Sequence, residues 1–400
     1  MTRRLACITA AVALFCGQAM AADFAQLEQR LRAGLAFPAR AAALLEDLTA
    51  WDAVAKRTFD ADYLKQLNPA ERQRLQRDLA ARMQIDLRAF LDGKTVSNVE
   101  LTKADSGSTL NLRLQRDGTP LDIKLELEDT PDGPRLSDAR LGDWRLKDDY
   151  RRRFGRRADS DLSYGVLGAL LADTPYILLE DFSGNAEGQI PDGWVTWRNK
   201  DEKKPKLYNV RRQGERNYVA ARDTGLSVIL GKPIHWNPRK HPILTWCWRA
   251  EVLPTGGDEK SDKLNDSAAG LYVLFSRNWL GVPRQIKYVW STTLPEDTWY
   301  RRPRIFRPYF LVVESGETNL GRWTFEQVDL ERDHRRAFDG DAPDKRTLAL
   351  GMLTDSNSTD SYAEALYADF RAWTRQAHTE GLIEDYCGCY DDAPLKEDSP

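Results

Sequence analysis

The stretch "ILTWCWRAEV", Ile243–Val252, decides the fold class of the longer part of the chain. Its residues alternate between two faces with a period of two, which is the pattern of a β-strand. One face carries the tryptophans Trp246 and Trp248, and the other carries Cys247 and Arg249. We therefore expect a strand whose tryptophan face is buried in the core of a sheet protein.

Short runs of this kind recur over residues 175–373, with turn residues between them. Many short strands separated by turns are typical of a β-sandwich or jelly roll. We predict a jelly-roll sandwich over residues 176–375. In it, the first strand "YILLEDF" (Tyr176–Phe182) is expected to lie beside the last strand "EALYADFRAW" (Glu364–Trp373).

The part of the chain before this sandwich begins with helical patterns. Apolar residues spaced by three and four predict helices from residue 23 to about residue 92. One helix has a clear start, with Asn68 as N-cap, Pro69 in the first turn and Glu71 three residues after the cap. A short helix is also expected within "DLSYGVLGALLAD", residues 161–173.

A sheet follows these helices. From Ser97 to Leu146 the period changes to two, and glycine-containing turns separate the runs, which predicts an antiparallel meander with one buried face. Helices followed by such a sheet indicate an α+β, cup-like domain over residues 23–155. Residues 156–175 would link it to the sandwich.

The first 21 residues, "MTRRLACITAAVALFCGQAMA", are typical of a secretory signal peptide. A basic start and an apolar stretch precede Ala19-Met20-Ala21, and cleavage is expected after Ala21. We expect a periplasmic or secreted protein whose mature chain has no transmembrane segment. The balance of 58 Lys and Arg against 61 Asp and Glu gives no reason to expect nucleic acid as a partner.

Three cysteines remain after this cleavage: Cys247, Cys387 and Cys389. The last two form a Cys-Gly-Cys motif in a C-terminal tail, residues 376–400. An odd number of cysteines in an oxidising compartment leaves at least one unpaired within the chain. A redox or metal-binding dithiol, a disulfide that ties the tail to Cys247, and free thiols are all compatible with this pattern.

Two resemblances follow from longer motifs. The motifs "LEDFSGN" and "IPDGW", residues 179–194, the segment Leu244–Phe275 and "LTDSNSTDSYAEALYADFRAW", residues 353–373, resemble a family of secreted bacterial proteins, domain of unknown function 3047. This resemblance implies a jelly-roll sandwich similar to carbohydrate-binding and laminin-type modules. It implies no particular activity.

The N-terminal half is similar to the periplasmic phospholipid-carrier family of the toluene-tolerance or Mla type. The similarity lies in Trp51–Met83, with its "LNPAERQR" motif, and in the closing segment "DWRLKDDYRRRF", Asp143–Phe154. It implies a helix-plus-sheet domain that encloses a cavity for acyl chains.

Carboxylates at the ends of the two neighbouring sandwich strands suggest a structural calcium ion. Calcium prefers six to eight oxygen ligands. Asp181 or Glu180 of the first strand would meet Asp369 of the last, helped by Asp355 in the polar loop "DSNSTD". The alternative is that these carboxylates cap turns or pair with Arg371.

Aromatic and polar residues of the sandwich could form a ligand groove, because sugar rings stack on flat aromatic side chains. The segment "RNWLGVPRQ" places a tryptophan between two arginines, and the long acidic loop 254–268 could supply a polar rim. The predicted ligand-binding residues are Trp279, Arg277, Arg284, Trp290, Asp258 and Asp266.

Three functions are compatible with the sequence. The first is an exported, non-catalytic protein that binds a glycan or lipid of the cell envelope. The second is a glycan-active hydrolase or lyase that uses carboxylates of the sandwich, and the third is a structural or assembly protein of the envelope. No nucleophile, zinc or phosphate-loop motif assigns catalytic residues.

Overall fold

The computed structural model describes residues 29, 47–91, 94–104, 108–158, 163–197, 207–277, 281–301 and 308–390. The predicted signal peptide lies outside these residues. The chain divides into two compact units. Of the described residues, unit 1 contains those within 1–67, 72–159 and 170–173, and unit 2 contains those within 68–71, 160–169 and 174–400. The helices over residues 69–91 and 164–172 each cross this division and are described with the unit that contains most of their residues.

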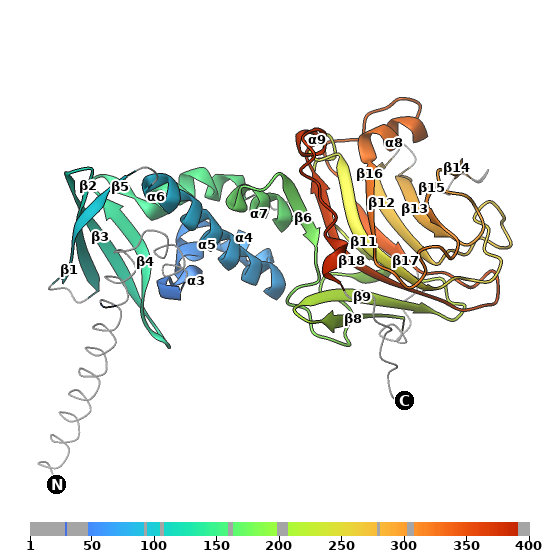
Figure 1. Ribbon diagram of the computed structural model, residues 1–400, viewed down its shortest axis with the longest axis horizontal. Coiled ribbons are helices and arrows are strands. Elements are labelled where there is room, and N and C mark those ends of the chain that lie inside the picture. Colours follow the sequence, from blue (N-terminus) through green and yellow to red (C-terminus); the bar gives the residue numbers. More distant parts are fainter. Residues whose placement is uncertain are drawn as a thin grey trace, which may run out of the picture. The chain divides into compact units, whose positions relative to one another are not determined.

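Unit 1 combines short helices, one long helix and a five-stranded sheet of order β1-β2-β3-β4-β5 (Figure 1). All neighbouring strands of this sheet are antiparallel. Its elements are α3 (Trp51–Thr58), α4 (Ala61–Gln66), α5 (Pro69–Leu91), β1 (Val96–Lys103), β2 (Thr109–Arg116), β3 (Thr119–Thr130), β4 (Gly133–Leu141), β5 (Trp144–Arg145), α6 (Leu146–Arg153) and the 3₁₀ turn η1 (Gly155–Arg157).

The predicted start of the long helix is confirmed. The Asn68 side chain accepts a hydrogen bond from the Glu71 backbone N–H at 2.9 Å, and Glu71 accepts one from the Asn68 backbone N–H at 3.0 Å. This reciprocal pair satisfies two N–H groups that the helix itself leaves without partners. Pro69 is the first residue of α5, as the sequence predicts.

Unit 2 is a β-sandwich with short helices (Figure 1). One sheet has seven strands in the order β14-β15-β13-β12-β17-β10-β7, and the other has the order β16-β11-β18-β9-β8, with β6 paired to β18. Its elements are α7 (Tyr164–Ala172), β6 (Tyr176–Glu180), β7 (Val195–Trp197), β8 (Tyr208–Gln213), β9 (Arg216–Asp223), β10 (Ile229–Lys232), β11 (Ile243–Val252), β12 (Ala269–Arg277), β13 (Pro283–Ser291), β14 (Trp299–Arg301), β15 (Tyr309–Ser315), β16 (Thr324–Asp329), α8 (Leu330–Ala337), β17 (Ala349–Leu353), β18 (Ala363–Trp373), α9 (Arg375–Thr379) and the 3₁₀ turn η3 (Cys387–Cys389).

The α+β class and the sandwich are confirmed by this arrangement. Strand β11 is the segment from which the sandwich is predicted, and its tryptophan face is core: Trp246 and Trp248 are fully buried in one cluster with Tyr288 and Trp290 of the opposite sheet. The two tryptophan rings pack edge to face at 5.3 Å. Burial of these large aromatic side chains removes apolar surface from water and stabilises the sandwich.

The first and last strands of the sandwich lie side by side, as predicted. Strand β6 pairs antiparallel with β18 from Glu180, opposite Phe370, to Tyr176, opposite Trp373. The loop "DSNSTD" therefore leads into a central strand that has β11 on one side and, along its length, β9 and β6 on the other.

The three cysteines among the described residues form one disulfide and leave one free thiol. Cys247 of β11 and Cys387 of η3 are joined, with Cα atoms 5.6 Å apart, and Cys389 is free and exposed. The segment around the disulfide is also packed, because Tyr386 and Tyr390 contact the outer face of the sheet that contains β11. The tail up to Tyr390 is thus attached to the sandwich rather than extended from it.

Candidate functional site

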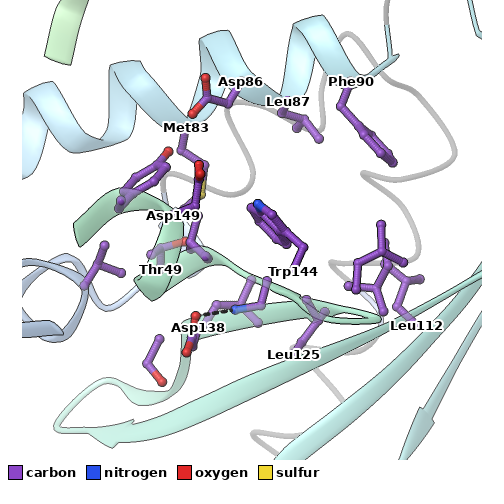
Figure 2. A pocket seen from close by; sticks show the side chains of 18 of the residues that line it. Thr49, Met83, Asp86, Leu87, Phe90, Leu112, Leu125, Asp138, Trp144 and Asp149 are labelled. Carbon is purple, nitrogen blue, oxygen red and sulfur yellow. Dashed lines mark hydrogen bonds between the residues drawn. The ribbon is translucent and has the colours of Figure 1, made fainter. Parts of the chain in front are cut away.

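The main candidate site is an apolar cavity inside unit 1, with a volume of about 470 Å³. Figure 2 shows α5 along one side of it and the strands of the sheet along the other, with Trp144 between them. Small-molecule sites in proteins have volumes of roughly 300–1,000 Å³ and mainly apolar walls. The cavity has the size and the lining of such a site.

The sheet wall is built by strand register. Leu112 of β2, Ile123 of β3 and Leu141 of β4 form one row of directly opposed residues. Leu125 and Ala139 form the neighbouring row. Because side chains alternate between the faces of a strand, both rows point to the same side, and all five residues line the cavity.

The opposite wall comes from α5. Met83, Leu87 and Phe90 are spaced by four and three residues and lie on one face of the helix, toward the cavity (Figure 2). These three side chains are half-buried rather than buried. The helix therefore presents an apolar stripe that the sheet of unit 1 does not cover completely.

Trp144 lies at the cavity from the short strand β5. It is 43% exposed, which makes it one of the large hydrophobic residues that unit 1 leaves in contact with solvent. It nevertheless lines the cavity with the leucines of the sheet. An aromatic side chain in this position would gain contacts from an apolar ligand without a rearrangement of the core.

A group of charged residues lies at the α5–α6 end of the cavity. Arg153 donates to both oxygens of Asp86, at 2.8 and 3.1 Å, and to Asp149 at 3.1 Å. Arg82 forms a further ion pair with Asp86 at 3.0 Å. The carboxylates are thus paired with arginines, and this end of the cavity offers both hydrogen-bond donors and acceptors to a polar group of a ligand.

Tyr150 is buried beside these charges and is expected to remain neutral. Burial is the main cause that raises its pKa far above the usual value, and the Asp86 carboxylate raises the pKa further. Its ring packs edge to face against Phe154 at 5.4 Å. The tyrosine therefore contributes a fixed, uncharged wall to the cavity.

At the sheet, Asp138 is a structural carboxylate. Its Oδ1 accepts the backbone N–H groups of Ala139 and Lys147, each at 3.0 Å, and its Oδ2 accepts the Arg145 guanidinium at 3.0 Å. Because its oxygens have these partners, we assign it to holding β4, β5 and the start of α6 together.

The residues predicted to line a ligand groove of the sandwich have other positions and partners in the structure. Trp279 lies outside the described residues. Trp290 is 0% exposed, because it points from β13 into the aromatic core, where its indole N–H donates to the Gly316 carbonyl oxygen at 3.1 Å. Its prediction as a ligand-binding residue was therefore wrong. Arg277 is exposed and donates to Gly281 O, and Arg284 pairs with Asp341 at 2.9 Å.

The two acidic loop residues have structural partners. Asp258 accepts the Lys260 backbone N–H at 2.9 Å, which closes a local turn. Asp266 is fully buried, and its Oδ2 accepts the backbone N–H groups of Ser358 and Thr359 at 2.8 and 2.6 Å. Asp266 thus fixes the loop "DSNSTD" and is not part of an exposed rim.

The carboxylates predicted to hold calcium have other partners. Arg371 binds both oxygens of Asp369, at 2.8 and 2.9 Å, and the Glu180 Oε2 atom accepts Lys232 at 2.7 Å. Asp181 accepts the Ser183 N–H and hydroxyl. Among the described residues, no group of three or more His, Cys, Asp or Glu side chains is placed to hold a metal ion. These residues as placed do not form a calcium cage, and calcium stays a prediction.

Asp355, the fourth of those residues, lies in a different cluster. Burial raises its pKa to about 6, and the carboxylates of Asp266 and Asp223 raise it as well, whereas the Lys287 ammonium and a hydrogen bond from the Ser227 side chain lower it.

The residues that line the cavity of unit 1 were not among the predicted site residues. Their signal was the alternation of leucines in the meander, which predicted a buried face but not that part of this face would remain uncovered.

The comparisons with known proteins bear mainly on unit 2. Residues 192–371 match the model of the family described as protein of unknown function (DUF3047). The predicted resemblance to this family is confirmed over these residues. No curated protein matches the chain with significance.

Two solved structures are similar to parts of the chain. One is a phospholipid-binding protein from Ralstonia solanacearum in complex with a phospholipid, with 16% identity, coverage of 40% of this chain and 93% of that one, and a TM-score of 0.26. The other is a family 11 carbohydrate-binding module of a cellulosomal cellulase of Clostridium thermocellum, with 9% identity, coverage of 50% and 94%, and a TM-score of 0.27. At these TM-scores, neither similarity supports a conclusion about function.

None of the described helices is both long enough and apolar enough to cross a membrane.

Proposed function

We propose that the protein is a non-catalytic binding protein that holds an apolar chain, such as the acyl chain of an envelope lipid, in the cavity of unit 1. The observation that carries this proposal is the unfilled apolar space of about 470 Å³ between α5 and the sheet. Leucine rows, a helix stripe and Trp144 line this space, and no side chain among the described residues of unit 1 fills it.

The exposure of the apolar lining supports an occupant. The cavity is open to solvent on the side of Trp144, which is 43% exposed, and the α5 stripe is only half-buried. Apolar surface that stays in contact with water gains roughly 25 cal/mol per Å² when it is buried. An apolar ligand in the cavity would cover this surface and add packing contacts to it.

The charged residues at one end suit a ligand with a polar head. Asp86 and Arg153 are only partly buried, with side-chain exposures of 30% and 36%. A lipid head group could hydrogen-bond to them while its chain lies against the leucines. Because each carboxylate there has an arginine partner, a strongly charged head group is not required.

The test is to fill the cavity from within. We expect 11-(dansylamino)undecanoic acid to bind wild-type protein with one site per chain, and Ala139→Phe to weaken this binding at least tenfold, because the new ring occupies the ligand space next to Leu125. Fluorescence titration of the purified full chain gives both affinities, and circular dichroism checks that the variant is folded.

The matched control is the next residue on the same strand. Arg140 is exposed and points to the opposite face of β4, so Arg140→Phe adds the same ring outside the cavity. We expect wild-type affinity for this variant. Equal affinities of Ala139→Phe and wild type would contradict the proposal.

We also propose that this function is carried out after export. The basic and apolar N-terminal segment with Ala19-Met20-Ala21 supports a periplasmic or secreted location. Cell fractionation followed by N-terminal sequencing tests it. A chain recovered from the cytoplasm that begins at Met1 would contradict it.

A further inference from the structure

A second cavity lies on the outer face of the seven-stranded sheet of unit 2. Its volume is about 160 Å³, about one third of the cavity in unit 1. Tyr272 of β12 and Lys287 of β13 stand opposite each other in register, and both line it. Their strand neighbours, such as Leu271 and Ile286, belong to the core, so the alternation of side chains places this cavity on the face away from the core.

Glycines shape the floor of this face. Gly231 of β10 and Gly351 of β17 stand opposite each other, and a Cβ atom at these positions would meet the Trp197 ring at 2.1 and 3.1 Å. At Gly270 of β12, a Cβ atom would meet Lys287 Cε at 2.4 Å. Glycine inside a strand weakens it and often marks a place of close approach. Here the glycines make room for two of the groups that line the cavity.

Three charged side chains line the cavity although they are almost fully buried. Lys287 Nζ donates to Ser267 Oγ at 2.5 Å and lies 5.6 Å from the centre of the Tyr272 ring. Glu259 and Asp355 are each 3% exposed. Glu259 Oε2 accepts the Ser291 hydroxyl at 2.6 Å.

Each of these carboxyl groups also has an unused oxygen. Among the described residues, Glu259 Oε1 and Asp355 Oδ1 have no hydrogen-bond partner. A buried acceptor without a partner costs free energy, and native proteins rarely leave one without a reason. These two atoms therefore indicate that the cavity takes a ligand or water that donates hydrogen bonds.

The carboxyl groups are perturbed in a way that is common at functional sites. Burial raises the pKa of Glu259, with Asp258 adding to the effect and Ser291 and Lys287 opposing it. Burial also raises the pKa of Asp355 to about 6. Such shifts cluster at binding and catalytic sites.

The charged side chains that line the second cavity favour some classes of ligand over others. A metal cation is disfavoured by the Lys287 ammonium, and an anion is disfavoured by the two carboxyl groups. A purely apolar ligand would leave the unused oxygens without donors. A neutral ring with several hydroxyl groups could donate to the carboxyl oxygens, accept from lysine and place its C–H face against Trp197 or Phe310.

We infer that this cavity is a binding site for a neutral pyranose sugar. Glu259, Asp355 and Lys287 hydrogen-bond its hydroxyl groups, and Trp197 packs against its ring. The site lies entirely in unit 2, and the inference does not depend on the apolar ligand proposed for unit 1.

The test is a titration of the full-length mature protein with the methyl glycosides of glucose, galactose, mannose and N-acetylglucosamine. Saturation-transfer difference NMR measures the binding of each sugar. For ligands of this size we expect a dissociation constant on the order of 1 mM for at least one of them. Trp197→Ala should weaken that binding roughly tenfold, and Asp355→Asn, which keeps the shape of the side chain, should weaken it severalfold.

The matched control is Tyr362→Ala, which removes an exposed aromatic side chain of unit 2 that does not line this cavity and should leave sugar binding unchanged. Thermal melting of each variant shows whether it is folded. The inference is overturned if none of the four glycosides binds at 20 mM, or if folded Trp197→Ala and Asp355→Asn proteins both bind as wild type does.

Discussion

The buried carboxyl group of Asp355 should make stability depend on pH. Its ordinary pKa of 3.8 is raised to about 6 in the folded protein, mainly by burial. Between these values the folded state binds more protons than the unfolded state, so this group lowers the stability of wild type as pH rises from about 4 to about 6. Above pH 6 the loss persists.

Asp355→Asn should remove this loss, because asparagine does not ionise. The gain in unfolding free energy of Asp355→Asn over wild type should be larger at pH 8 than at pH 4.5, by about 1–3 kcal/mol. Denaturant unfolding of both proteins at the two pH values measures the difference. If the gain is the same at pH 4.5 and pH 8, Asp355 does not titrate in this range.

At the residue scale, the sequence identified core positions better than ligand-binding positions. Trp246 and Trp248 could be assigned to the core because alternation in a strand fixes which side chains share a face. Trp290 lies beside a turn in the sequence, and this position suggested an exposed side chain instead of a core one. Lys287, in the otherwise apolar run "IKYVW", was the overlooked signal for the second cavity.

At the scale of elements, the capped start of α5 should contribute measurably to the free energy of unfolding. Asn68→Ala removes the side-chain acceptor for the Glu71 N–H and should lower the free energy of unfolding by about 1 kcal/mol. Urea unfolding of the full chain measures it. Asn68→Ser is the matched control, since serine is an equally good N-cap, and a loss as large as that of Asn68→Ala would argue against capping as the cause.

The disulfide between Cys247 and Cys387 also contributes to the free energy of unfolding, because it links two distant elements. It joins β11 to η3 across 140 residues, and a cross-link that closes a loop of this length restricts the unfolded chain strongly. Cys387→Ser should therefore lower the free energy of unfolding by roughly 2–5 kcal/mol. Packing of Tyr386 and Tyr390 on the sheet should keep the tail docked.

Thiol labelling provides the accompanying check. In the non-reduced mature protein, Cys389 is exposed and free, so a maleimide should modify one site per chain. Reduction and unfolding should raise this number to three. Three reactive thiols without reduction would contradict the disulfide, and Cys389→Ser should leave the unfolding free energy unchanged.

The elements themselves were predictable where local signals agree. The capping residues of α5, the turns of the meander and the alternation in β11 each indicate their element from a few neighbouring residues. Strand pairing is less local: the adjacency of β6 and β18 was expected only from the jelly-roll arrangement, and it is confirmed by their register. The disulfide partner of Cys247 could not be chosen, because cysteine spacing does not determine connectivity.

At the scale of the whole molecule, the chain joins an α+β unit with an apolar cavity to a β-sandwich with a small polar one. The sequence predicted the two fold classes from the change of hydrophobic period. A cavity in the α+β unit was expected only from the resemblance to the phospholipid-carrier family, and the small polar cavity of the sandwich was not predicted. The extent of a cavity depends on how far α5 stands from the sheet and on which glycines leave space between strands. Those distances are set by packing of the complete unit.

The most direct measurement of the central proposal is native mass spectrometry of the mature protein purified from a bacterial host without added detergent. We predict that wild type and Arg140→Phe carry a bound lipid, seen as a discrete added mass that disappears on denaturation. Ala139→Phe should be recovered folded and without that mass. Wild-type protein that carries no lipid, or an equal load on Ala139→Phe, would contradict the assignment of the unit 1 cavity as a lipid site.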